Sequence, residues 1–131
     1  VAIMALSNFL FSILPYAHVE QNPPLALALE LNQVWPAGTV IYYTAENSDN
    51  NLVRYFNPNT EWKRLTDFRQ LQTDLNASQS QGKAIWLETT TIDQILAQAD
   101  GTIWLASHVK PESRRELINR AYRIRLFEIH P

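Results

Sequence analysis

The stretch GKAIWLETTTIDQILAQADGTIWLAS, residues 82–107, decides the fold that this sequence predicts. Its apolar runs at 84–88 and 102–107 have the composition of strands that are covered on both faces. Residues 91–99 lie between these runs, have the apolar spacing of a helix, and begin with a T-x-x-Q capping box at Thr91. A strand, a helix and a second strand in this order predict a parallel β-α-β unit.

The same alternation of strand and helix extends over the rest of the chain. Further strands are predicted at 39–45, 61–65 and 122–129, and the last two are more polar, as edge strands are. The helices are predicted over residues 23–34, 49–56 and 111–121, with another beginning after Asp67.

Together these elements predict one α/β domain over residues 17–131. We expect three layers, α/β/α, around a five-stranded, mainly parallel, Rossmann-like sheet with the strand order 2-1-3-4-5. The two polar strands are placed at the edges of this sheet, where their polar faces meet water.

Each of the three glycines, Gly38, Gly82 and Gly101, comes just before a predicted strand. We expect each one to end the preceding helix in the left-handed conformation, which glycine adopts without a steric penalty. Dinucleotide and phosphate loops need glycines at the opposite place, between a strand and the helix that follows it. The sequence therefore predicts no such loop and no cofactor.

Composition excludes several other classes of function. The net charge is -2 at pH 7, which gives no indication of a nucleic-acid partner. Cysteine is absent, and this excludes disulfides, thiolate metal sites and cysteine nucleophiles. The three histidines, His18, His108 and His130, lack the spacing of metal ligands, so no metal site is predicted.

The first residues form an uncharged, apolar segment that ends at Pro15. It is shorter than the roughly 20 apolar residues of a membrane span and lacks the basic start of a signal peptide. Because the chain begins with Val1, we interpret residues 1–16 as the end of a transmembrane helix; the alternative is a buried helix of a soluble protein. The first basic residue is Arg54, which favours the extracytoplasmic, periplasmic side of the membrane.

Polar residues follow the predicted strands, at the edge where open parallel sheets bind ligands. The candidate ligand-binding residues are Glu46, Asn47, Asp49, Glu88, Thr89, Ser107 and His108. Glu46 and Glu88 could form a carboxylate pair, and His108 could act as a base beside Ser107. The structural alternative is that these side chains cap helices, and none is predicted to be catalytic. Apolar surfaces for a sugar are expected nearby from Tyr42, Tyr43, Trp86 or Trp104.

Two stretches resemble a junction found in a known family. They are SNFLFSILPYAHVEQNPPLALALELNQVWPAGTVIYY, residues 7–43, and LVRYFNPNTEW, residues 52–62. They are similar to the end of the last transmembrane helix and the start of the C-terminal soluble domain in multi-pass bacterial glycosyltransferases. These enzymes use polyprenyl-phosphate sugars and are related to protein O-mannosyltransferases and aminoarabinose transferases.

The resemblance implies a domain that is not itself the catalyst, because the catalytic acid of that family lies near the N-terminus of the full protein. The chain would be a membrane-associated accessory domain whose partners are the membrane-embedded part of its parent and a sugar or lipid-linked sugar. Two alternatives stay open. One is a stand-alone binder or enzyme with its site at the strand ends, and the other is a structural module that forms a homodimer through residues 1–14.

Overall fold

The computed structural model describes residues 6, 7, 10 and 21–131. Apart from those first three residues, the apolar helix predicted over 1–16 and the dimer surface predicted over 1–14 lie outside the described residues. Within the described part, none of the helices combines the length and the apolar character that a membrane span requires.

The first half of the described chain forms the predicted elements in the predicted order. Asn22 caps the first helix by accepting a hydrogen bond from the backbone N–H of Leu25 at 3.3 Å, and Asp67 caps α5 by accepting one from Arg69 at 2.9 Å. The elements are α3 (Pro23–Val34), β1 (Val40–Tyr43), α4 (Ser48–Phe56), β2 (Glu61–Arg64), α5 (Phe68–Gln81) and β3 (Ile85–Glu88).

The strand predicted over residues 102–107 is wrong, because this segment lies within a helix. Two helices follow β3, namely α6 (Thr89–Leu96) and α7 (Gly101–His108). Gly101, Leu105 and Val109 are buried at intervals of four residues, whereas the neighbouring Ile103 is 71% exposed. That spacing is helical, and a short apolar run alone does not distinguish a helix from a buried strand.

The helix predicted over residues 111–121 is also wrong. A 3-10 turn (Pro111–Ser113) leads into β4 (Arg115–Ile118), which forms a hairpin with β5 (Arg123–Ile129). The side chain of Asn119 makes the turn by accepting hydrogen bonds from the backbone N–H groups of Ala121 and Tyr122, at 2.8 and 2.9 Å.

These differences change the sheet. Its strand order is β2-β1-β3-β5-β4 instead of 2-1-3-4-5. β1 is parallel to β2 and β3, whereas β5 is antiparallel to both β3 and β4, so the sheet is mixed and not mainly parallel. The hairpin makes β4 and β5 antiparallel to each other, and β5 takes the place beside β3. β2 lies at an edge as predicted, but β5 does not.

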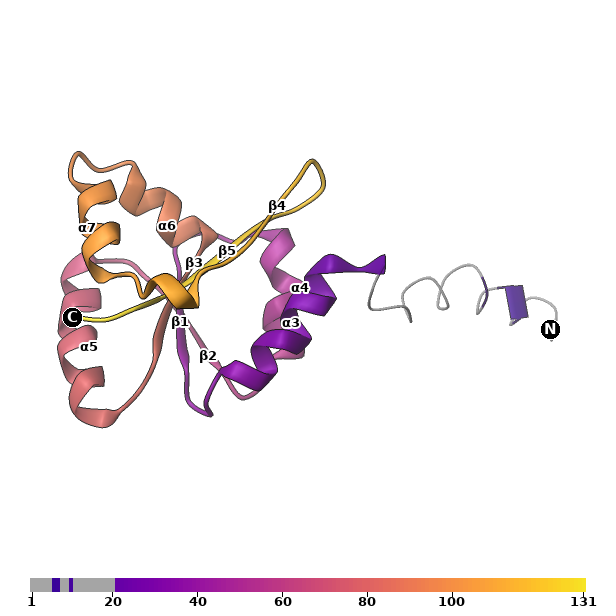
Figure 1. Ribbon diagram of the computed structural model, residues 1–131, viewed down its shortest axis with the longest axis horizontal. Coiled ribbons are helices and arrows are strands. Elements are labelled where there is room, and N and C mark those ends of the chain that lie inside the picture. Colours follow the sequence, from indigo (N-terminus) through magenta and orange to yellow (C-terminus); the bar gives the residue numbers. More distant parts are fainter. Residues whose placement is uncertain (1–5, 8–9, 11–20) are drawn as a thin grey trace.

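Helices cover both faces of this sheet, which gives three layers. α3 and α4 lie side by side on one face, and α5, α6 and α7 lie on the other (Figure 1). Each face has its own apolar core. The core under α3 and α4 contains Ala28, Leu31, Trp35, Ile41, Val53, Trp86, Ile124 and Leu126. The core under the other three helices includes Tyr42, Leu71, Leu75, Ile85, Leu87, Ile92, Ile95, Leu105 and Phe127.

Two of the three glycines have the predicted conformation. Gly38 and Gly82 have φ values of 81° and 62°, and Gly82 ends α5. Gly101 differs, because it begins α7 and its φ is not positive. A Cβ atom at this position would lie 1.7 Å from the backbone oxygen of Ile95, so glycine is needed here for close packing of α7 against the end of α6.

We expect Gly101→Ala to destabilise the chain more than Gly82→Ala. The matched change at Gly82 meets no atom within 4 Å, so it costs only the left-handed backbone penalty of about 1–2 kcal/mol. Gly101→Ala must in addition move the backbone, and such overpacking costs about 1–3 kcal/mol or more. Urea denaturation of both variants measures the difference, and equal losses would contradict the packing role of Gly101.

Candidate functional site

The chain leaves two neighbouring strands toward opposite faces of the sheet. β1 leads into α4 on one face, and β3 leads into α6 on the other (Figure 1). In open α/β sheets such a switch point, at the carboxyl ends of the strands, is where ligands bind.

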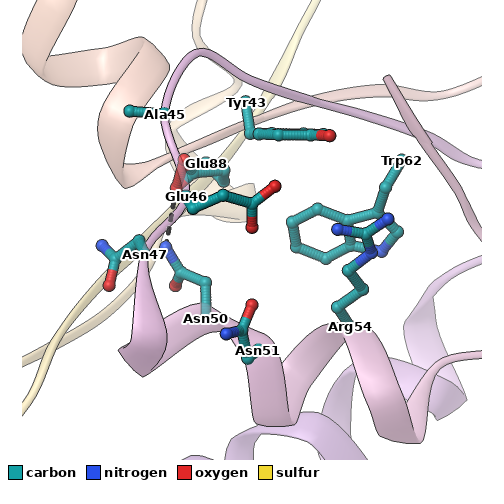
Figure 2. Close-up of a pocket in the computed structure, with 9 residues that line it drawn as sticks. All are labelled: Tyr43, Ala45, Glu46, Asn47, Asn50, Asn51, Arg54, Trp62 and Glu88. Carbon is teal, nitrogen blue, oxygen red and sulfur yellow. Dashed lines mark hydrogen bonds between the residues drawn. The ribbon is translucent and has the colours of Figure 1, made fainter. Parts of the chain in front are cut away.

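A hollow lies at this place, and we call it the β1–β3 hollow. It is lined by Tyr43, Ala45, Glu46, Asn47, Asn50, Asn51, Arg54, Trp62 and Glu88 (Figure 2). Its volume is about 210 Å³ when the open mouth is included. Inside, the centre of a water molecule has only about 10 Å³ of space, which is room for about one water.

Glu88 lies at the inner end of the hollow and is almost completely buried, with 1% of its surface exposed. Its carboxylate accepts hydrogen bonds from the backbone N–H of Thr90 at 2.9 and 3.0 Å and from Asn50 Nδ2 at 2.6 Å. The hydroxyl of Thr90 is a further partner. Glu88 therefore caps α6, in place of the capping box predicted at Thr91, whose own hydroxyl donates to the carbonyl of Tyr42.

The environment of Glu88 acts on its pKa in both directions. Burial is the largest influence and raises the pKa of this carboxyl, and the nearby Asp93 raises it further. The hydrogen bonds from Thr90 and Asn50 favour the charged form and lower it. The net effect is a raised pKa, so this carboxylate depends on its donors to stay charged inside the protein.

Thr90 connects the ends of β1 and β3. Its hydroxyl oxygen accepts hydrogen bonds from the backbone N–H groups of Thr44 at 2.9 Å and Ala45 at 3.1 Å. The same hydroxyl contacts Glu88 and the carbonyl of Ala45. The loop after β1, which carries Ala45 and Glu46 of the hollow, is thus held against the start of α6.

Asn50, on α4, is buried beside Glu88 with 4% of its surface exposed. Its Nδ2 group donates to Glu88 and, at 3.3 Å, to the hydroxyl of Thr89. Its Oδ1 atom is buried and has no hydrogen-bond partner among the described residues. Buried polar atoms are rarely left unpaired, so this oxygen is an acceptor for which the described residues supply no donor.

Aromatic and charged side chains form the opposite side of the hollow. The rings of Tyr43 and Trp62 have centroids 6.4 Å apart, and the Arg54 guanidinium lies 5.5 Å from the centroid of Tyr43. Glu46 and Asn51 are exposed and extend toward the space between this aromatic side and Glu88 (Figure 2). The hollow therefore combines two acids, amides, one guanidinium and two aromatic rings.

Three other predicted residues have structural roles at this edge. Asn47 caps α4 by accepting the backbone N–H of Asp49 at 2.9 Å, and its side chain points away from the hollow (Figure 2). Asp49 accepts the backbone N–H of Arg123 at 3.0 Å. Thr89 is buried and accepts the backbone N–H of Arg125 at 2.8 Å. Asp49 and Thr89 thus hold β5 against the sheet.

Ser107 and His108 are not at the carboxyl edge, because their segment is helical. Both lie in the last turn of α7, where Ser107 Oγ and His108 Nδ1 approach the carbonyl oxygen of Trp104 at 2.9 and 2.8 Å. Ser107 Oγ and His108 Nδ1 also lie 2.9 Å from each other, and the tautomer of His108 decides which of the two donates. The pair therefore lies on α7, away from Glu88, and the role of His108 as a base beside Ser107 stays a prediction.

Besides Ala45, the sequence interpretation missed the four polar, charged or aromatic residues Asn50, Asn51, Arg54 and Trp62 of the hollow. The signal for the first three was the helical spacing of residues 47, 50, 51 and 54, which places them on one side of α4. Tyr43 was expected near the site and is there. Tyr42 and Trp86 were expected there too, but both are buried in the cores.

The described residues contain no group of three or more His, Asp or Glu side chains that could hold a metal ion. No family model, no curated protein and no solved structure matches the chain.

We expect the Glu88→Gln variant to reveal the raised pKa of Glu88 as a pH-dependent difference in stability. A raised pKa means that the folded chain binds this proton more tightly than the unfolded chain. Its stabilising effect is complete below the unfolded pKa of about 4.3 and is lost as the pH rises through the folded pKa.

The free energy of unfolding of the wild-type chain minus that of Glu88→Gln should therefore fall as the pH rises from about 4.3. Urea denaturation at several pH values gives this difference. The matched control is Glu46→Gln, which changes the exposed acid of the same hollow. Its free energy of unfolding should change with pH as that of the wild-type chain does. A difference that is constant with pH would contradict the prediction.

Proposed function

We propose that the chain is a non-catalytic, extracytoplasmic accessory domain of a membrane glycosyltransferase, and that it assists binding of the acceptor or of the lipid-linked sugar. The β1–β3 hollow is the proposed contact site. The observation that carries this proposal is the buried Oδ1 of Asn50, which has no hydrogen-bond partner among the described residues and lies in a hollow that also contains Tyr43 and Trp62.

An unpaired buried acceptor favours a ligand that brings a hydrogen-bond donor. Leaving such a group without a partner costs about 1–3 kcal/mol, and a donated bond recovers much of that cost. The inner space fits about one water molecule, so a single hydroxyl group can replace a water there. The exposed Glu46 and Asn51 supply further acceptors at the mouth.

The aromatic side of the hollow complements the apolar face of a sugar ring. Tyr43 and Trp62 are only partly buried, so their rings are accessible from the mouth. Aromatic residues offer a large contact area with a polar end, which suits a ligand that is apolar on one face and hydroxylated at its rim. Arg54 adds a cation that suits a phosphate or carboxylate on the same ligand.

The proposal of a non-catalytic role is based on the burial and the hydrogen bonds of the Glu88 carboxylate. A general acid or base must be within reach of the substrate proton and have the appropriate protonation state. The carboxylate of Glu88 is buried and occupied by Thr90 and Asn50. The proposal of a membrane-embedded partner is based on the resemblance of residues 7–62 to the glycosyltransferase junction. The proposal of the periplasmic side is based on the absence of basic residues before Arg54.

We expect sugar phosphates to bind the 131-residue chain at the hollow. Amide NMR should show shifts at residues 46–51, 54, 62 and 88. Trp62→Leu should weaken binding by about two- to tenfold, since an aromatic contact contributes about 0.5–1.5 kcal/mol. Tyr55→Leu is the matched control, because Tyr55 is on α4, 78% exposed and outside the hollow.

Two outcomes would contradict this function. Equal weakening by the Trp62 and Tyr55 changes, or shifts confined to other surfaces, would remove the hollow as the contact site. Turnover of a sugar phosphate by the chain alone would show that the domain is catalytic.

A further inference from the structure

A second concave site lies on the opposite layer of the molecule, between α5 and the turn that joins α6 to α7. We call it the α5–α7 cleft. It is lined by Phe68, Leu71, Gln72, Ile95, Gln98, Asp100, Gly101 and Trp104. The centre of a water molecule has about 150 Å³ of space in this cleft, against about 10 Å³ in the β1–β3 hollow. A space of about 150 Å³ is comparable to a cavity that binds one benzene ring.

The inside of this cleft is apolar. Leu71 and Ile95 belong to the core under α5, α6 and α7, and Phe68 and Trp104 pack against that core while staying partly exposed. Four apolar side chains therefore surround a space of the size of a single ring.

Trp104 is held in a fixed position by a neighbour. The ring of His108 stacks on its indole with centroids 4.2 Å apart and an angle of 12° between the planes. His108 is itself fastened by the contact of its Nδ1 with the carbonyl of Trp104 at 2.8 Å. The indole is thus preorganised, which lowers the entropic cost of binding against it.

The mouth of the cleft carries a negative charge. Asp100 occupies the N-cap position of α7, yet its side chain makes no capping hydrogen bond and is exposed. No ion pair involves Asp100 among the described residues. Gln72 and Gln98 are the other polar residues of the lining, and no basic residue lines the cleft. The full negative charge of Asp100 exceeds the partial positive charge of the α7 N-terminus beside it, about half a unit charge, so the mouth favours a cation.

We propose that the α5–α7 cleft is a binding site for a small organic cation that carries one apolar ring. The ring enters between Phe68 and Trp104, and the ammonium group stays at the mouth beside Asp100. An aromatic side chain of the cleft attracts such a cation further through its ring electrons, by about 0.5–1 kcal/mol at exposed sites. This site is separate from the β1–β3 hollow and does not depend on the function proposed there.

Three compounds with the same ring test the proposal on the 131-residue chain. They are benzylamine, benzyl alcohol and benzoate, which are positive, neutral and negative at pH 7. We expect all NMR shifts to centre on the indole N–H of Trp104 and the amides of residues 68, 71 and 101. Benzylamine should bind more tightly than benzyl alcohol, and benzoate should bind least.

The Asp100→Asn variant should lower benzylamine affinity by about two- to fivefold, as expected for one partly solvated ion pair, and leave benzyl alcohol unchanged. The matched control Glu112→Gln changes an exposed acid elsewhere and should have no effect on either compound.

Several results would overturn the proposal. Equal binding of the amine and the alcohol would show an apolar site suited to a neutral chain or a partner's side chain. Trp104 signals that change with protein concentration alone would show that a second copy of the chain covers the cleft. An absence of shifts near Trp104 with all three compounds would show that the cleft binds no such ring.

Discussion

The carboxylate of Glu88 holds together the elements on which the rest of the structure depends. It stands at the end of β3, accepts from Asn50 of α4 on one face of the sheet, and caps α6 on the other through Thr90. Thr90 in turn fastens the loop after β1. A buried charge is tolerated only when enough donors surround it, so these elements have to assemble together for the carboxylate to be stable.

This constraint also decides what the carboxyl edge of the sheet can bind. Glu88, Thr89 and Asp49 are already hydrogen-bonded inside the protein. Within the part of the chain that the structure describes, the acceptors of the hollow left for a ligand are Glu46, Asn51 and the Oδ1 atom of Asn50. The two acids of the hollow therefore differ, because Glu88 is buried and hydrogen-bonded whereas Glu46 is exposed. This difference supports the proposal that the hollow holds a hydroxylated group.

The sequence was sufficient to predict the chain from α3 to β3, because each helix there has a local start signal. Asn22 and Asp67 act as caps as their positions suggest, and Gly82 ends α5 in the left-handed conformation. These signals lie within a few residues of the helices that they begin or end. They can therefore be recognised in the sequence without knowing which distant residues lie nearby in the fold.

The second half could not be predicted in this way, because long-range contacts decide it. The run at 102–107 is equally suitable for a strand or a helix, and the place beside β3 is taken by β5. Backbone hydrogen bonds between Lys110 and Glu128 and between His130 and His108 hold the chain beside β3.

The burial of a site residue could not be predicted either. Sequence spacing does not show whether an acid at the end of a strand faces water or is buried, as Glu88 is.

The helical state of residues 101–108 separates the two candidate sites. As a strand, this segment would have extended the parallel part of the sheet and placed Ser107 and His108 beside Glu88. As a helix, it limits the parallel part to three strands, which still leaves the one switch point between β1 and β3. It also carries His108 to the opposite layer, where the imidazole supports Trp104. One segment thus removes a potential base from the polar hollow and orders an apolar cleft.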